Sequence, residues 1–186
     1  AYVARSLKTL LGKDFEKVYG EVREVSADKG KLMAQYKSKI FSAAMEKADA
    51  SRGRVIYQRT CAACHVMYGE GGKIGPELTG SNRADVDYLL LNVIDPNYDV
   101  PEGYRLVTIT SKGGQVFAGM VAEEDADKIV LTMVGQTSVI AKADVKTRVT
   151  LKISLMPESL LLTLKDNEFL DLIQYLRTEK QAPLPK

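Results

Sequence analysis

Residues 57–80 read YQRTCAACHVMYGEGGKIGPELTG and contain both cysteines of the chain, Cys61 and Cys64, together with its single histidine, His65. Two cysteines separated by two residues and followed at once by histidine form the pattern CxxCH. All thiol and imidazole groups of a 186-residue chain therefore stand within five consecutive positions. Such a concentration of ligand side chains indicates that this stretch carries the chemistry and organises the fold around it.

Four interpretations of CxxCH differ in the ligands and the setting that they need. A disulfide redox pair normally sits in a βαβ unit, whereas a helical pattern precedes this motif. Structural zinc takes four Cys or His ligands, and an iron–sulfur cluster needs more thiolates still, but the chain has three such residues. A plain pair of core thiols is the third alternative, and it does not require the adjacent histidine.

Covalent haem attachment is the fourth interpretation, and it explains the spacing. Cysteines at i and i+3 lie on one face of a helical turn, so both sulfurs can form thioethers with one edge of a porphyrin. The next residue then places its imidazole at the iron. The sequence therefore predicts one covalently bound haem c, with Cys61 and Cys64 as thioether donors and His65 as the proximal iron ligand.

Composition and charge argue against other classes. Hydrophobic residues make up 45% and charged residues 27% of the chain, as in globular proteins, and the formal net charge is only +2. No concentrated basic face is apparent, so a nucleic-acid partner is not expected. No apolar run reaches the roughly 18 residues of a transmembrane segment. A signal peptide is also absent, so an exported protein would be represented here by its mature form or by an excised piece.

Periodicity predicts the secondary structure. Residues 1–49 contain no proline and repeat apolar residues at helical spacing, which predicts a helical N-terminal extension. Further helices are predicted at 51–64 and 83–94. Short runs rich in β-branched residues and separated by glycine turns predict a small antiparallel sheet at about 103–153. Helix returns at the C-terminus, from near Asp166, where Phe169, Leu172, Ile173 and Leu176 repeat on one face.

Four segments occur in the order seen in a known family: GRVIYQRTCAACHVMYGEGGKIGPELTG, LLLNVIDPNYDVPEGYRLVTIT, GQVFAGMVAEE and SLMPESLLLTLKDNEFLDLIQYLR. Over about residues 50–180 the chain resembles class I cytochromes c, and among them a type of haem-binding domain from planctomycetes and verrucomicrobia. The resemblance implies a mainly α, class I cytochrome c fold with an inserted small antiparallel sheet. It divides the chain into a helical N-terminal extension, 1–49, and a cytochrome c domain, 50–186. The extension is either the end of a preceding helical domain or part of a free-standing protein.

The resemblance also assigns a role to the segment IGPELTG. In class I cytochromes c a Gly-Pro-x-Leu segment passes the proximal face of the haem, and the proline carbonyl accepts a hydrogen bond from the iron-bound histidine. Such a bond fixes the orientation of the ring. Pro76 follows His65 by eleven residues, so we expect its carbonyl to accept this hydrogen bond.

A distal iron ligand is sought among the six methionines, because one histidine excludes bis-histidine ligation within the chain. Five of them lie next to His65, before the attachment helix, or inside predicted strands where core packing is the ordinary role: Met67, Met33, Met45, Met120 and Met133. Met156 lies in a loop before the last helix, where Pro157 restricts the backbone. The distal methionine of class I cytochromes c occupies the same place. We therefore predict Met156 as distal ligand, with loop packing as the alternative.

The expected function is one-electron transfer rather than enzymatic turnover, because His/Met ligation leaves no open iron position for a substrate. The expected partner is a redox protein or a fused dehydrogenase domain, and the oligomeric state is left open. Covalent haem attachment takes place outside the cytoplasm, so we expect a periplasmic or otherwise exported protein. The alternatives are a gas or redox sensor with a labile Met156 and a haem enzyme of the peroxidase type. Propionate-binding candidates are Arg83, Tyr88, Tyr98 and Arg105.

Overall fold

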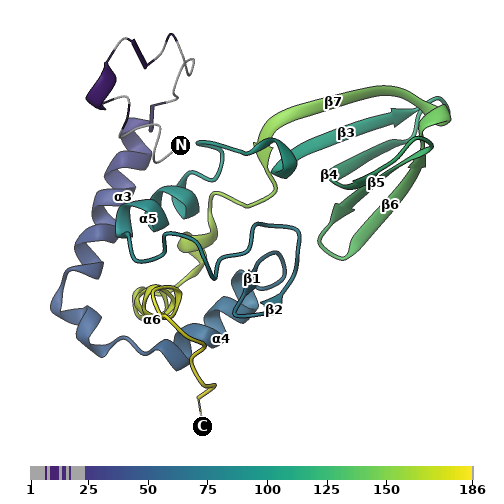
Figure 1. Cartoon of the computed structure of the whole chain (residues 1–186). Coiled ribbons are helices and arrows are strands. Elements are labelled where there is room, and N and C mark those ends of the chain that lie inside the picture. The colour runs from purple at the N-terminus through teal and green to yellow at the C-terminus, as the bar shows by residue number, and fades with distance from the viewer. Residues whose placement is uncertain (1–6, 8, 13, 16, 18–23, 186) are drawn as a thin grey trace.

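The computed structural model describes residues 7, 9–12, 14, 15, 17 and 24–185. Most of the expected helical extension before residue 24 therefore lies outside the described residues. The remainder forms a helical body and a five-stranded sheet (Figure 1). Among the described residues, no helix combines the length and the apolar character needed to cross a bilayer.

Four α-helices build the helical body: α3 (Ala27–Ile40), α4 (Ala50–Thr60), α5 (Val86–Ile94) and α6 (Asp166–Leu176). The first three begin at the N-cap residues Ser26, Asp49 and Asp85, respectively. The side chain of each accepts a hydrogen bond from a backbone amide in the first turn of its helix. Short 3₁₀ helices lie at Ala43–Lys47 and Leu160–Thr163, and two more flank the sheet at Glu102–Tyr104 and Lys142–Asp144. The predicted helices at 51–64 and 83–94 are thus present but shorter, and α4 ends just before Cys61.

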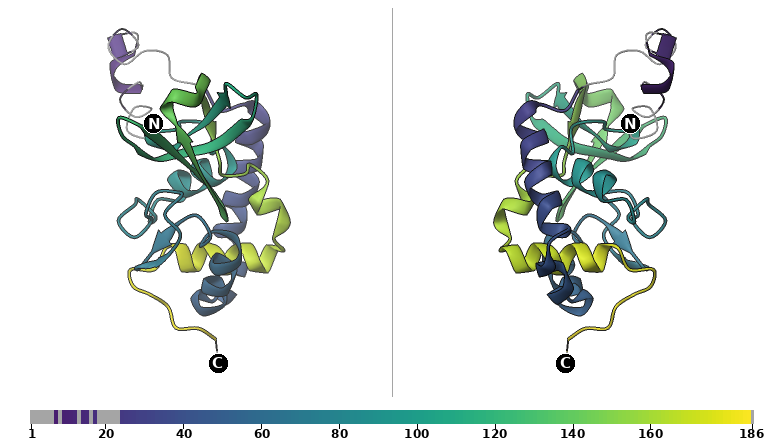
Figure 2. Two further views of the ribbon diagram at one scale, coloured as in Figure 1. Left: turned by 90° about the vertical axis from the view of Figure 1, so that its right-hand side faces the viewer. Right: turned by 90° about the vertical axis from the view of Figure 1, so that its left-hand side faces the viewer.

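The main hydrophobic core lies between these helices. The apolar face predicted for the last helix is confirmed, since all four of its residues are buried: Phe169, Leu172, Ile173 and Leu176. Tyr36 and Ile40 of α3 belong to the same core. In the side views of Figure 2, α3 runs along the helical body, with the sheet toward one end and α6 toward the other. The domain boundary at residue 50 stays a prediction.

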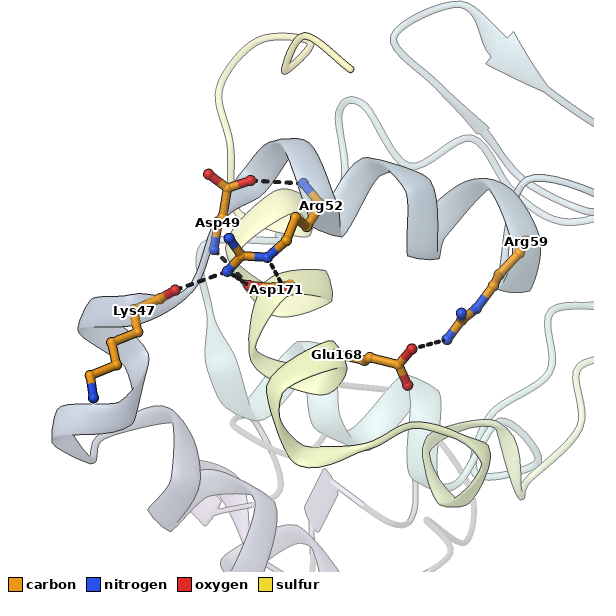
Figure 3. A network of polar contacts seen from close by, with 6 residues as sticks. All are labelled: Lys47, Asp49, Arg52, Arg59, Glu168 and Asp171. Atoms are coloured by element: carbon orange, nitrogen blue, oxygen red, sulfur yellow. Dashed lines mark hydrogen bonds and ion pairs between the residues drawn. The ribbon is translucent and has the colours of Figure 1, made fainter. Parts of the chain in front are cut away.

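Polar contacts hold α4 against α6 (Figure 3). The guanidinium of Arg52 donates from Nε and Nη2 to the buried carboxylate of Asp171, at 2.7 and 2.8 Å, and also to the carbonyl of Lys47 at 3.0 Å. The amide of Asp49 donates to the same carboxylate at 2.7 Å. Asp171 therefore has its charge compensated and its oxygens paired, which is what burial of a carboxylate requires.

The sheet is antiparallel throughout, in the order β6-β5-β4-β3-β7. Its strands are β3 (Arg105–Ser111), β4 (Val116–Glu124), β5 (Lys128–Met133), β6 (Gln136–Ala141) and β7 (Val145–Ser154). It has a small core of its own, formed by Val107, Ile109, Ile129, Leu131 and Ile140. The sheet predicted at about 103–153 is therefore present. Its last strand, β7, did not stand out as a separate apolar run, because it is an edge strand and largely exposed.

The predicted fold class is wrong. Within residues 24–185, helices α3 to α6 hold 14, 11, 9 and 11 residues, and strands β3 to β7 of the sheet hold 7, 9, 6, 6 and 10. The five-stranded sheet is therefore a substantial part of the molecule, which does not have the mainly α, class I cytochrome c fold expected with a minor insertion. The physical reason is that the sheet buries a separate apolar cluster, so it is a structural layer in its own right.

Candidate functional site

The CxxCH motif forms a tight turn at the end of α4. The amide of Cys61 donates to the carbonyl of Tyr57 at 2.8 Å, and the amides of Cys64 and His65 both donate to the carbonyl of Cys61 at 3.0 Å. This turn places the two cysteines beside each other along the wall of one cavity. They are not joined by a disulfide. Burial raises the pKa of both thiols, so they are protonated at neutral pH.

The following loop folds back over the turn. β1 (Val66–Met67) and β2 (Glu70–Gly71) form a two-residue hairpin whose central residues, Tyr68 and Gly69, have positive φ angles of 52° and 80°. Beyond it, the amides of Gly72 and Gly75 each donate at 2.7 Å to carbonyls of the turn, those of Ala62 and Cys64. Backbone hydrogen bonds thus bring the segment around residue 76 against His65.

His65 is held from two sides. Its Nδ1 lies 2.8 Å from the carbonyl oxygen of Pro76. A carbonyl can only accept, so Nδ1 carries the proton and donates. The buried hydroxyl of Tyr57 donates to the backbone carbonyl of His65 at 2.7 Å. Burial lowers the pKa of His65, and the hydrogen bond to Pro76 offsets part of this effect. The imidazole is therefore neutral with a free lone pair on Nε2, which is the form that binds a metal.

A cavity of about 200 Å³ opens beside His65. Its wall contains Cys61, Cys64, His65, Pro76 and Met156, so the structure brings all five predicted site residues together. Most of the remaining wall is apolar, from α5 and from the loop before α6: Leu89, Val93, Pro157 and Leu160 among others. A smaller apolar cavity next to it shares Cys61 and Met156.

This donor set fits a haem. Two thiols and one imidazole lie along one wall of an apolar cavity that also contains a thioether sulfur, which are the groups needed for covalent attachment and two axial bonds. Within the described part of the chain, no group of three or more His, Cys, Asp or Glu side chains is arranged to hold a metal ion by itself. A zinc or iron–sulfur site is therefore short of ligands here.

A cavity residue that sequence reasoning set aside is Met120. Its place within a predicted strand indicates core packing, yet in the structure Met120 lines the cavity beside His65 from β4. Neighbouring side chains of a strand alternate between faces. Phe117 and Val121 pack against the core of the sheet, so Met120 faces the other way. The sequence shows that side chains of β4 alternate between two faces. It does not show that the face with Met120 lies beside the cavity wall formed by α5.

Two of the four propionate-binding candidates line the cavity, namely Arg83 and Tyr88, whereas Tyr98 and Arg105 are not part of its wall. Arg83 is 7% exposed. Its guanidinium donates to carbonyls at Leu78 and Thr79 and at the end of α6, as well as to the hydroxyl of Tyr68. Arg83 therefore already ties the loop after the CxxCH turn to the end of α6.

Comparisons with known proteins agree with this geometry. The site is that of a c-type cytochrome. The family model described as cytochrome c oxidase, cbb3-type, subunit III, matches residues 48–176, which is more than half of the chain, and the chain belongs to this family. It is 43% identical over 49 residues to a cytochrome c-553-like protein of Synechocystis sp. (strain ATCC 27184 / PCC 6803 / Kazusa) and 50% identical over 36 residues to a cytochrome c of Cochliobolus lunatus.

These alignments cover 26% and 19% of the chain and 46% and 33% of the two relatives, so the chain spans less than half the length of either. Family membership establishes haem c as the type of cofactor and electron transfer as the general function. This membership favours an electron-carrying role over an enzymatic one. The narrower resemblance to the planctomycete and verrucomicrobial domain type stays a prediction.

Proposed function

We propose that the chain binds one haem c through Cys61 and Cys64, with His65 as proximal and Met156 as distal iron ligand, and that it transfers single electrons. The observation that carries this proposal is the neutral imidazole of His65, held at 2.8 Å by the carbonyl of Pro76 beside both thiols and the Met156 thioether. When bound, the haem supplies the one-electron iron couple.

The protein's own residues would control that couple. The hydrogen bond to Pro76 fixes the ring of His65 and increases its basicity. The mostly apolar wall, from α5 and from the loop that carries Met156, would offer few polar partners to water beside the iron. With Met156 as its second ligand, the thioether would favour the reduced state and raise the reduction potential. If His65 and Met156 both bind the iron, no coordination position is left for a substrate, which suits a carrier better than a catalyst.

Covalent attachment is the first testable prediction. After denaturation, the purified holoprotein should have the mass of the polypeptide plus one haem, and acidic organic solvent should extract no pigment. Cys61→Ala should leave a single thioether or prevent maturation, because each sulfur forms one bond to the porphyrin edge. Haem that leaves the wild-type protein on extraction would contradict the assignment of both cysteines.

The distal ligand is tested by one substitution at two cavity methionines. Met156→Leu conserves volume and should cost less than about 1.5 kcal/mol of stability, but it removes the thioether. We expect loss of low-spin character and of the weak far-red band of methionine–iron(III) coordination, a lower reduction potential, and ready CO binding to the reduced form.

Met120→Leu is the matched control, because Met120 lines the same cavity. It should change stability by a similar amount and leave the haem spectrum unchanged, as should Met133→Leu on the exposed end of β5. If the low-spin character and the far-red band were lost in Met120→Leu and kept in Met156→Leu, Met120 of the sheet would be the distal ligand. A wild-type protein that is high-spin or binds CO at once would instead favour a sensor or a peroxidase-type enzyme.

We further propose that the protein works outside the cytoplasm, in the periplasm or as an otherwise exported protein, since covalent haem attachment takes place outside the cytoplasm. Its partner would be another redox protein or a dehydrogenase domain fused to it. In the second case the chain would act as one relay within a larger oxidoreductase. The apolar side chains of Leu160 and Pro157 at the cavity wall support docking of such a partner close to the haem edge. If a partner docks at Leu160 and Pro157, substitutions of these two residues should change the rate of electron transfer to that partner.

A further inference from the structure

The Met156 loop is anchored to a helix that lies outside the family match. That match begins at residue 48, whereas α3 spans Ala27–Ile40 and packs beside α5 (Figure 1). In the first turn of α3, the Nζ of Lys29 lies 2.6 Å from Oδ1 of Asp95 and 2.8 Å from Oε1 of Glu158. Asp95 caps the end of α5. Glu158 follows Met156 by two residues. One ammonium group therefore joins α3, α5 and the loop.

The same network reaches the residues before Met156. Asn97 donates from Nδ2 to Oε1 of Glu158 at 2.6 Å, and its Oδ1 accepts from the amide of Ser154 at 2.8 Å. The hydroxyl of Ser154 in turn accepts from the amide of Met156 at 3.1 Å. Hydrogen bonds thus lead from both sides of Met156 to Asn97 and Glu158, and Glu158 is tied to the body of the protein by Lys29.

Burial makes the ion pair with Asp95 effective. The side chain of Asp95 is 0% exposed and that of Lys29 is 20% exposed, whereas that of Glu158 is 44% exposed. Burial lowers the pKa of Lys29, but hydrogen bonds and charge from Asp95 and Glu158 outweigh it, and the pKa lies above its usual value. Removing the Lys29 ammonium would take away an ion-pair partner of a carboxylate that has no exposure to solvent, and loss of a charge partner at a buried site is strongly destabilising.

We propose that Lys29 is a positioning residue that holds the Met156 loop in place, so that the N-terminal helix α3 controls how firmly the distal ligand binds. This inference rests on the proposed ligand role of Met156. The proposal gives α3, which lies outside the family match, a function in the redox site. A firmly held Met156 loop would keep the protein an electron carrier. A loosened loop would open the distal position of the iron.

The test compares Lys29→Met with Lys37→Met in haem-loaded protein. Lys37 also joins α3 to α5, through an ion pair with Asp87 at 2.7 Å, but this pair is more exposed and involves no residue of the loop. Amide hydrogen exchange of residues 154–160 should accelerate about tenfold in Lys29→Met and stay near wild type in Lys37→Met. The far-red band should weaken, and CO should bind faster, in Lys29→Met only. Lys29→Arg, which keeps charge and donors, should restore both.

Two further variants separate the possible failures. Glu158→Gln leaves the Lys29–Asp95 pair intact and should raise loop exchange in the same direction but less, which keeps the test usable if Lys29→Met does not fold. Lys29→Met in the Met156→Leu background should still accelerate exchange, because the anchor does not depend on the iron bond. Unchanged exchange in both Lys29→Met and Glu158→Gln would overturn the inference. An unchanged far-red band in Met156→Leu would instead refute the ligand assignment on which it rests.

Discussion

Replacing Gly53 with alanine is expected to lower the free energy of unfolding by about 3 kcal/mol or more, at the upper end of the range for overpacking. A Cβ at this position would lie 1.9 Å from the carbonyl oxygen of Asp171 and 2.7 Å from Cβ of Tyr175. Helices α4 and α6 therefore meet backbone to backbone, and no change of rotamer can relieve the overlap. The contacts of Arg52 and Asp49 with Asp171 would be displaced as well (Figure 3).

Thermal and urea unfolding of the holoprotein measure this effect. For a chain of this size, about 3 kcal/mol corresponds to a fall in Tm of roughly 6–12 °C. Gly30→Ala is the matched control, because Gly30 also lies within a helix, α3, but has no atom within 4 Å of the added Cβ. There alanine should stabilise by about 0.5–1 kcal/mol through helix propensity alone. Equal stability of the two variants would show that α4 and α6 do not approach as described.

Replacing Gly75 with alanine is expected to damage the haem site much more than the fold. The added Cβ would lie 2.4 Å from Cε1, 2.6 Å from Nδ1 and 2.9 Å from Nε2 of His65. The imidazole is the end of a side chain and can swing away, so the cost in stability should stay within the roughly 1–3 kcal/mol typical of overpacking. That movement breaks the hydrogen bond to Pro76, and loss of such a supporting contact typically reduces metal affinity about 10–100-fold.

The measurements are the haem content per polypeptide and the spectrum of the reduced protein. We expect Gly75→Ala to mature poorly and to yield a weakened or high-spin haem signal in the fraction that is loaded. Gly80→Ala lies in the same loop, and its added Cβ meets no atom within 4 Å, so haem content and spectrum should match wild type. Normal maturation of Gly75→Ala with a low-spin spectrum would contradict the placement of His65 against residue 75.

The haem-binding motif can be recognised from the sequence, because its chemistry depends on the local spacing of the two cysteines and the histidine. Cysteines at i and i+3 followed by histidine need only one turn of backbone to lie along one wall, and they do so at the end of α4. The expectation that the Pro76 carbonyl accepts from His65 came from the resemblance to class I cytochromes c, and the structure has the two atoms 2.8 Å apart. The apolar face of α6 was equally readable, since helical periodicity alone specifies it.

Features that depend on contacts between distant segments could not be predicted from the sequence and became visible in the folded chain. The balance of helix and sheet came out differently from expectation because edge strand β7 pairs with β3, from which it is separated by three strands, and the sheet closes over its own core. Met120 reaches the cavity because the face of β4 that lacks the sheet core lies toward the helices. Lys29 contacts Glu158 across 129 positions. Spacing along the chain cannot specify such pairs, because packing of whole elements brings them together.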